Sequence, residues 1–178
     1  RLGRDMLARV LNGGQTSLII GFLAASISSI VGLFIGINAG YFKGNIDKTI
    51  TIMIDLFLTF PTFFLLLALV SYIQASALIL IIVISITSWM GMARMIRSES
   101  FAIGNKPFIK ILKVANVSTF KIIFKYFAPL LAPIFLISFT FGVGGSILAE
   151  SGLSFLGLGI NPPSMSWGSL LSDGKAVI

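Results

Sequence analysis

Long stretches without a charged residue dominate this sequence. No charge occurs in residues 10–42, and a second uncharged run covers residues 56–93. A membrane-spanning helix needs about 20 apolar residues, because each residue adds about 1.5 Å of rise. The first run therefore predicts one span, strongest over residues 17–41. The second run is too long for one crossing and must fold back.

The polar patch at residues 71–76 is the best place for that turn. The other three spans are then expected at residues 50–70, 77–96 and 126–148. After Glu150, glycines and a Pro-Pro pair interrupt the apolar pattern. This predicts a hydrophobic interfacial loop with Trp167 in an aromatic belt, and no fifth span. The predicted fold class is all-α integral membrane, a helical bundle with about four spans.

Charge predicts the orientation. Residues 94–125 carry seven Lys and Arg residues against one acid, Glu99, so this segment is expected in the cytoplasm. Alternation puts the turn at residues 71–76 outside and a loop at residues 43–49 inside. The same alternation places three N-terminal cations outside, against the positive-inside rule: Arg1, Arg4 and Arg9.

A short amphipathic helix is predicted at residues 107–116, between the third and fourth spans, with a proline at its start. Four apolar residues spaced i, i+3, i+4 and i+7 share one face: Phe108, Ile111, Leu112 and Ala115. That face needs a partner, either the lipid surface or a groove on a cytosolic protein. Nucleic acid is the weakest candidate, because there is only one short basic stretch and it is tied to the membrane.

Three features lie inside the spans. Asp55 is an acid inside a span, and two roles are open to it. It either lines a transport pathway or, as we favour, pairs with a cation of the cytoplasmic segment. Pro61 is expected to kink the second span, which either shapes packing or lines a cavity. Small residues recur at every fourth position of the first span and predict close helix packing: Ala24, Ser28, Gly32, Gly36 and Gly40.

Composition agrees with this interpretation and excludes several chemistries. The chain has 178 residues, of which 56% are hydrophobic and 11% charged, whereas soluble domains carry about 25% charged residues. It contains no Cys and no His, which removes thiol nucleophiles, imidazole bases and Cys/His metal sites. It also lacks a GxxxxGK[ST] phosphate-binding loop. We therefore expect no catalytic residue, no metal site and no cofactor in this chain.

The sequence resembles the inner-membrane permease subunits of ABC importers of the dipeptide/oligopeptide/nickel class. The most specific match is LAESGLSFLGLG at residues 148–159, which continues into PPSMSWG at residues 162–168. Further stretches of resemblance lie at residues 4–10, 40–47, 55–61 and 88–97. Members of that class usually have six spans, so residues 1–178 are expected to be one permease core domain from a longer chain.

The resemblance implies a function in which a partner hydrolyses ATP. The chain would form the translocation pathway for small peptides, nickel or metal chelates, and would work by alternating access. The implied partners are a second permease subunit, cytosolic ABC ATPases, an extracytoplasmic substrate-binding protein and membrane lipid, with no nucleic acid. The implied location is the inner membrane of a prokaryote. Direct ligation of a soft metal is not expected without His or Cys.

In that class the loop between the third and fourth spans holds a coupling helix that docks on the ATPase. Lys110, Ile111 and Leu112 stand at the Glu-Ala-Ala places of its motif, and Asn116 stands at the usual Gly. Pro129 matches the closing proline. The residues that the resemblance assigns to coupling are therefore Phe108, Lys110, Ile111, Leu112, Lys113, Ala115 and Asn116.

Two other functions remain open on the residues alone. A secondary transporter would show charges at membrane depth and broken helices in two repeats, whereas this chain has Asp55 and no evident repeat. A structural membrane protein would rest its amphipathic helix on lipid. Transport that depends on a co-expressed ATPase separates the importer from both alternatives.

Overall fold

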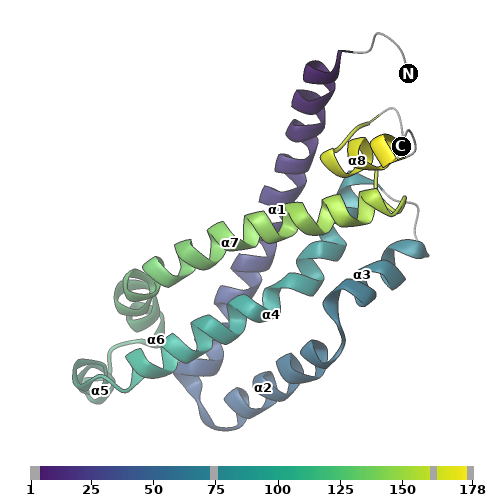
Figure 1. The fold of residues 1–178 in the computed structure, drawn as a ribbon. Coiled ribbons are helices and arrows are strands. Elements are labelled where there is room, and N and C mark those ends of the chain that lie inside the picture. Colours follow the sequence, from purple (N-terminus) through teal and green to yellow (C-terminus); the bar gives the residue numbers. More distant parts are fainter. Residues whose placement is uncertain (1–4, 73–75, 161–163, 176–178) are drawn as a thin grey trace. The chain divides into compact units, whose positions relative to one another are not determined.

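The computed structural model describes residues 5–72, 76–160 and 164–175. This part of the chain forms helices and contains no strand (Figure 1). The elements in chain order are α1 (Met6–Phe42), α2 (Gly44–Thr59), α3 (Thr62–Ser71), α4 (Ala77–Gly104), α5 (Pro107–Val114), α6 (Thr119–Ile122), the π-helical turn η1 (Ile123–Phe127), α7 (Ala128–Phe155) and α8 (Trp167–Lys175). The predicted all-α fold class is confirmed.

Three helical stretches of the described residues are long and apolar enough to cross a membrane: α1, α4 and the continuous run Thr119–Phe155. The pair α2 and α3 passes the same test together, although it is bent by 74°. The four predicted spans are therefore present if the bent pair counts as one. Part of the expected turn at residues 71–76 lies outside the described residues, but α3 ends at Ser71 and α4 begins at Ala77, as expected.

The bend lies at Pro61, where the sequence predicts a kink. Phe60 is extended, with ψ 129°, as expected for a residue that precedes proline. Its backbone N–H donates to the carbonyl of Phe57 and closes the last turn of α2. Because Pro61 has no N–H and its ring collides with the preceding turn, the helix stops and restarts at Thr62.

Two predicted loops are shorter in the structure. The expected loop at residues 43–49 is reduced to a sharp turn, because Lys43 and Gly44 adopt φ 56° and 59° and α2 begins at once. Asp47 lies in the first turn of α2, where the helix dipole favours an acid. The expected interfacial loop after Glu150 is present but starts later than predicted, because residues 156–160 and 164–166 are not helical. There α7 continues to Phe155, and α8 begins at Trp167.

The chain divides into two compact units. Unit 1 comprises residues 1–27, 61–88 and 142–178, and unit 2 comprises residues 28–60 and 89–141. The core of unit 1 contains Ile20, Ala24, Leu66, Val70, Leu80, Val83, Ile84 and Leu153. The larger core cluster of unit 2 contains Ile37, Tyr41, Met92, Ile96, Ile103, Ile109, Ile122, Phe127 and Leu131.

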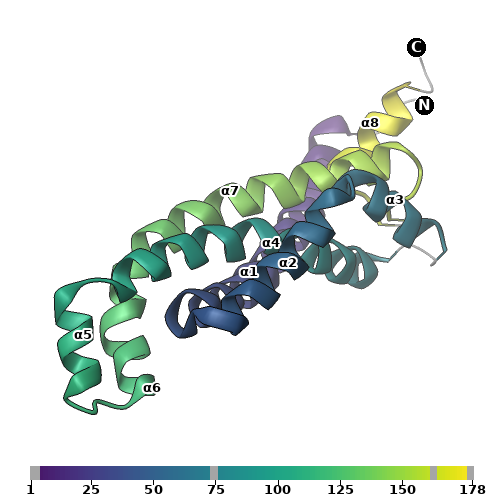
Figure 2. The ribbon, with the colours of Figure 1, turned by 90° about the horizontal axis from the view of Figure 1, so that it is seen from below.

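The basic residues concentrate in unit 2. This unit carries three acids, Asp47, Asp55 and Glu99, against nine cations: Lys43, Lys48, Arg94, Arg97, Lys106, Lys110, Lys113, Lys121 and Lys125. Figure 2 shows α5 and α6 as a short pair that follows α4 within this unit. The clustering supports the prediction that residues 94–125, which belong to this unit, face the cytoplasm.

Candidate functional site

Helix α5 is the candidate docking element. Pro107 occupies its first turn and Lys106, which precedes it, is extended, so the helix starts where the sequence predicts. Its last residue is Val114, and the turn that follows brings Asn116 to φ 55°. Glycine is favoured in this left-handed conformation and asparagine tolerates it. Asn116 therefore preserves the helix end at the place where the resemblance has a glycine.

The helix has one side packed on its own chain and one side open. Ile109 is completely buried in the core of unit 2, and Leu112 is partly buried against the same core. In contrast, Ile111 is 67% exposed, and Phe108 and Val114 are also exposed. The predicted face is thus divided, because Leu112 belongs partly to the inner side. Sequence reasoning missed Ile109, which anchors the helix.

Tyr41, in the last turn of α1, connects α5 to two neighbouring elements. The Lys113 ammonium lies 4.2 Å from the centroid of the Tyr41 ring. The Tyr41 hydroxyl donates to Oγ1 of Thr119 at 3.4 Å, and its ring meets the buried Phe127 edge-on at 5.4 Å. One buried side chain therefore touches the docking helix, α6 and the π-helical turn.

A second contact fixes the start of the docking segment. Lys43 Nζ donates to Oδ1 of Asn105 at 2.6 Å and lies 4.3 Å from the centroid of the Phe101 ring. Partial burial lowers the pKa of Lys43, and the charges of Lys113 and Lys110 lower it further. The turn after α1 is thus tied to the turn between α4 and α5.

Two ion pairs join α2 to α4 in unit 2. Asp55 pairs with Arg94, and both side chains are more than half exposed, at 57% and 55%. The structure therefore contains the cation pairing that the sequence favoured for Asp55. Asp47 pairs with Arg97 through two hydrogen bonds, one of them 2.8 Å from Nη2 to Oδ2. This second pair is more buried, with Asp47 13% and Arg97 29% exposed, and sequence reasoning missed it.

Part of the small-residue row lies directly on α4. A Cβ atom added at Gly32 would stand 2.7 Å from Cβ of Met92. One added at Gly36 would stand 2.7 Å from the carbonyl oxygen of Ala93, and one at Gly40 would stand 2.7 Å from that of Arg97. Backbone-to-backbone contact of this kind is what such rows permit in membrane helices. The other two members, Ala24 and Ser28, are buried.

The buried acid of this chain is Glu150, which sequence reasoning passed over as the end of a span. It lies inside α7 and is completely buried, whereas Asp55 is exposed. Its carboxylate accepts hydrogen bonds from the hydroxyls of Ser17 and Ser154. The sequence does contain a signal for the burial of Glu150. Serines follow it at positions +1 and +4, and their hydroxyls can donate hydrogen bonds to a carboxylate on the same helix.

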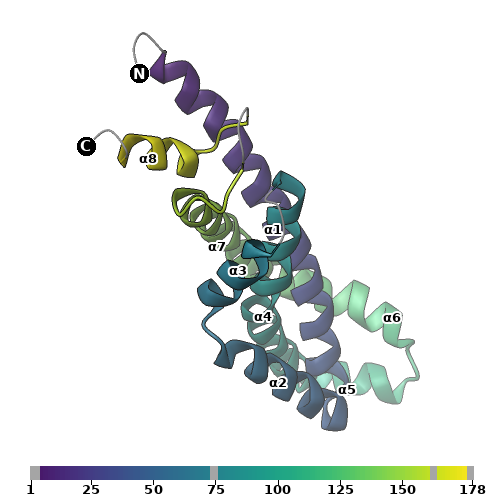
Figure 3. The same ribbon diagram turned by 90° about the vertical axis from the view of Figure 1, so that its right-hand side faces the viewer.

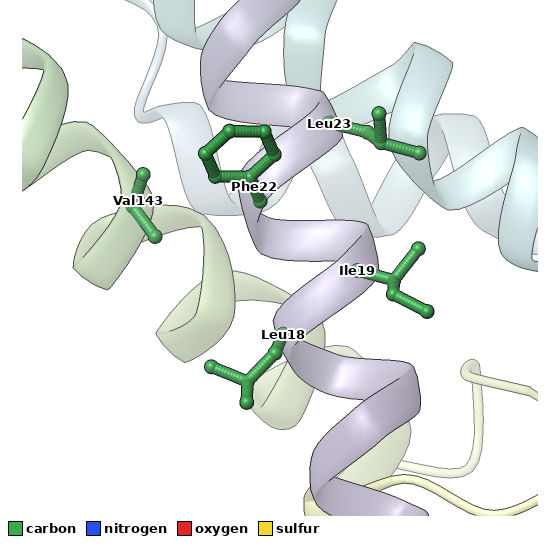
Figure 4. Close-up of a pocket in the computed structure, with 5 residues that line it drawn as sticks. All are labelled: Leu18, Ile19, Phe22, Leu23 and Val143. Atoms are coloured by element: carbon green, nitrogen blue, oxygen red, sulfur yellow. The ribbon is translucent and has the colours of Figure 1, made fainter.

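No candidate metal site emerges from the described residues, and one surface hollow is apolar. They contain no group of three or more His, Cys, Asp or Glu side chains that could hold a metal ion. A hollow on unit 1 is lined by five apolar residues of α1 and α7 (Figure 4): Leu18, Ile19, Phe22, Leu23 and Val143. This lining offers no group that could orient a polar ligand.

Residues 32–178 match the family described as binding-protein-dependent transport system inner membrane component. The chain belongs to this family. Its members are transport components of the inner membrane, which agrees with the apolar helices described above. The chain is accordingly a multi-pass inner membrane protein.

Two curated relatives and one solved structure are similar over almost the whole chain. The oligopeptide transport system permease protein OppC of Mycobacterium tuberculosis is 38% identical over 177 residues, which are 98% of this chain and 61% of the relative. OppC of Haemophilus influenzae is 36% identical over 174 residues, or 98% of this chain and 56% of the relative. The chain thus spans about 60% of the length of these relatives.

The solved structure is a chain of the MetNI methionine ABC transporter in an inward-facing conformation. It has a TM-score of 0.77 and 14% sequence identity, and the similarity covers 99% of this chain and 90% of that chain. At this identity the likeness concerns the fold alone. It agrees with the bundle of spanning helices predicted from the hydrophobic runs.

Proposed function

We propose that this chain is the core of a permease subunit of an ABC importer for peptides. The observation that carries the proposal is α5, an amphipathic helix with one side anchored by Ile109 and with Ile111 left exposed. A surface helix held rigidly by its own chain is suited to docking into a groove of a partner. The OppC relatives support a peptide cargo.

The proposed assembly contains a second permease subunit, two cytosolic ATPases and an extracytoplasmic binding protein. Docking of α5 on an ATPase would transmit nucleotide-driven closure to the spans, which would then open alternately to the two sides. The contacts of Tyr41 with α5, α6 and η1 offer a route for this transmission. Residues 1–178 would form the transmembrane core of the subunit, in which Asp55 pairs with Arg94 and Pro61 breaks the second span.

The test is a pull-down of the ATPase by the wild-type permease and by Ile111→Asp. Burying an unpaired carboxylate in an apolar groove costs about 2 kcal/mol or more, which corresponds to roughly 30-fold weaker association. Membrane insertion should be normal, because Ile111 is already 67% exposed in the isolated chain.

Leu171→Asp is the matched control, because Leu171 is similarly exposed, at 61%, but lies on α8. It should leave ATPase association unchanged. If α5 instead rests on lipid, Ile111→Asp and the wild type would recover equal amounts of ATPase. That result would contradict the coupling role.

A further inference from the structure

The carboxylate of Glu150 is the centre of a hydrogen-bonded cluster in unit 1. Its Oε2 accepts from the hydroxyl of Ser17 on α1 at 2.8 Å, and its Oε1 accepts from Ser154, one turn later on α7, at 2.6 Å. A third hydroxyl, that of Ser151, lies 3.4 Å from Oε2. Glu150 and Ser17 are completely buried, and Ser154 is 4% exposed. Both carboxylate oxygens are therefore used inside an apolar bundle.

Ser17 extends the cluster to α8. While its hydroxyl donates to Glu150, its oxygen accepts the backbone N–H of Trp167 at 3.1 Å. Trp167 is the first residue of α8 and this N–H is one of the donors that a helix start leaves without an internal partner. The chain Glu150–Ser17–Trp167 thus joins α7, α1 and α8 through one buried carboxylate.

Close packing surrounds this connection on two sides. A Cβ atom added at Gly14 would stand 2.8 Å from the Trp167 ring, and one added at Gly168 would stand 2.3 Å from the carbonyl oxygen of Ser151. The indole Nε1 of Trp167 donates to the carbonyl oxygen of Val10 at 3.0 Å. Figures 1 and 3 both show α8 beside the N-terminal part of α1. The start of α8 therefore rests on both helices.

Both side-chain positions of residue 150 that face the serines must be hydrogen-bond acceptors. A carboxylate only accepts, whereas a glutamine amide presents one acceptor and one donor. If the amide NH₂ faced Ser17, the serine oxygen would receive two donors and its own proton would have no acceptor. Turning the amide would instead point its NH₂ at Ser154, whose hydroxyl would lose the oxygen to which it donates. Glutamine fits the space of glutamate but not its hydrogen bonds.

We propose that Glu150 is a positioning residue that fastens the start of α8 to α1 and α7, through Ser17 and the backbone N–H of Trp167. We call Glu150, Ser17, Ser154 and Trp167 the Glu150 latch. Separation of the Ser17 and Glu150 side chains would leave buried polar groups unpaired. The latch therefore has a closed state and a broken state, and partly separated states between them are unfavourable. Its role is to keep α8 in a fixed place.

The Glu150 latch can be tested by cysteine labelling in the assembled transporter, because the chain has no cysteine of its own. Leu170 lies against α1, where its Cδ1 would be 3.1 Å from a Cβ at Gly13. Leu170→Cys should react slowly with a maleimide while the latch is closed. Leu171→Cys, at an exposed neighbouring position, reports the intrinsic reactivity of α8.

Glu150→Gln should accelerate labelling at position 170 about tenfold, which corresponds to ~1.4 kcal/mol, and leave labelling at position 171 unchanged. Ser17→Ala keeps the carboxylate and should have a similar effect, which covers the case in which Glu150→Gln fails to insert. Ser26→Ala is the serine control, because Ser26 is on α1 and donates only to the carbonyl oxygen of Phe22 in its own helix.

Unchanged labelling at position 170 in Ser17→Ala, in protein that inserts normally, would overturn the proposal. Equal acceleration at positions 170 and 171 would also overturn it, because that pattern reports general unfolding. The assay is done without nucleotide and does not depend on transport. Failure of the proposed importer function would therefore appear in the ATPase pull-down and leave these labelling rates untouched.

Discussion

The Lys113 ammonium on α5 lies 4.2 Å from the centroid of the Tyr41 ring at the end of α1. A cation this close to an aromatic face is held by the ring quadrupole as well as by packing. Tyr41 is buried and reaches Thr119 and Phe127 through its hydroxyl and its ring edge. Tyr41 therefore links α5 to α1, to α6 and to the π-helical turn that precedes α7.

We expect Lys113→Met to reduce transport while leaving ATPase docking intact. Methionine keeps much of the apolar stem of lysine and loses the charge, so about 1 kcal/mol of cation–π attraction disappears. We expect peptide uptake per ATP hydrolysed to fall about fivefold, while the ATPase still binds through the exposed side of α5. Uptake and ATP hydrolysis measured in the same vesicles give this ratio. Lys113→Arg should retain it, and Lys121→Met on α6 is the control for loss of a surface charge.

Gly36→Ala should destabilise the bundle. Its new Cβ would stand 2.7 Å from the carbonyl oxygen of Ala93 and 2.8 Å from Cβ of Ile96, so α1 and α4 would have to separate. Overpacking of this kind costs about 1–3 kcal/mol. The melting temperature in detergent should fall by several degrees. Gly91→Ala is the matched control, because a Cβ there has no neighbour within 4 Å, and it should melt at or above the wild-type temperature.

The two ion pairs of unit 2 should differ in their contribution to stability. Asp47→Asn leaves the largely buried Arg97 without its charged partner, at a cost of about 1–3 kcal/mol. Asp55→Asn disrupts an exposed pair, for which the cost is about 0–1 kcal/mol. Denaturation of the two variants in parallel measures the difference. The charge-swapped variant Asp47→Arg/Arg97→Asp should recover part of the loss, and equal destabilisation by both single variants would contradict the burial argument.

The orientation is tested by single cysteines at Ser118 and Tyr72. Ser118 lies between α5 and α6 in the basic unit 2, and Tyr72, which is 92% exposed, follows α3 in unit 1. An impermeant maleimide should label Ser118→Cys only from the cytoplasm and Tyr72→Cys only from outside. Labelling of both positions from one side would require a different number of spans.

The hydrophobic runs predicted the spanning helices, and Pro61 predicted the break in the second of them, because both depend on local physics. The interior of the bundle was less accessible from sequence. Glu150 follows an apolar run and therefore looks like a span end, although α7 continues for five more residues and buries it. The expected loop at residues 43–49 failed for a similar reason, since two residues with positive φ replace a whole loop.

The docking helix shows a further limit of pattern reading. Periodicity groups Phe108, Ile111, Leu112 and Ala115, but it does not say which apolar side packs on the chain itself. That choice depends on residues far away in sequence, such as Ile122 and Phe127, which form the core that receives Ile109. Arg9 is another example: it pairs with Asp173, so one cation that violates the positive-inside rule is partly neutralised by a residue 164 positions later.

The glycine contacts of α1 with α4 determine what can move. At Gly32, Gly36 and Gly40 the first helix contributes no side chain, so its backbone lies directly against Cβ atoms and carbonyl oxygens of α4, which would collide if one helix slid along the other. Within unit 2 we therefore expect the two helices to move together as one rigid body. Only Asn105 and Lys106 separate α4 from α5. A force applied to the docking helix would then rotate both helices together, and little of the movement would be absorbed by bending of either helix.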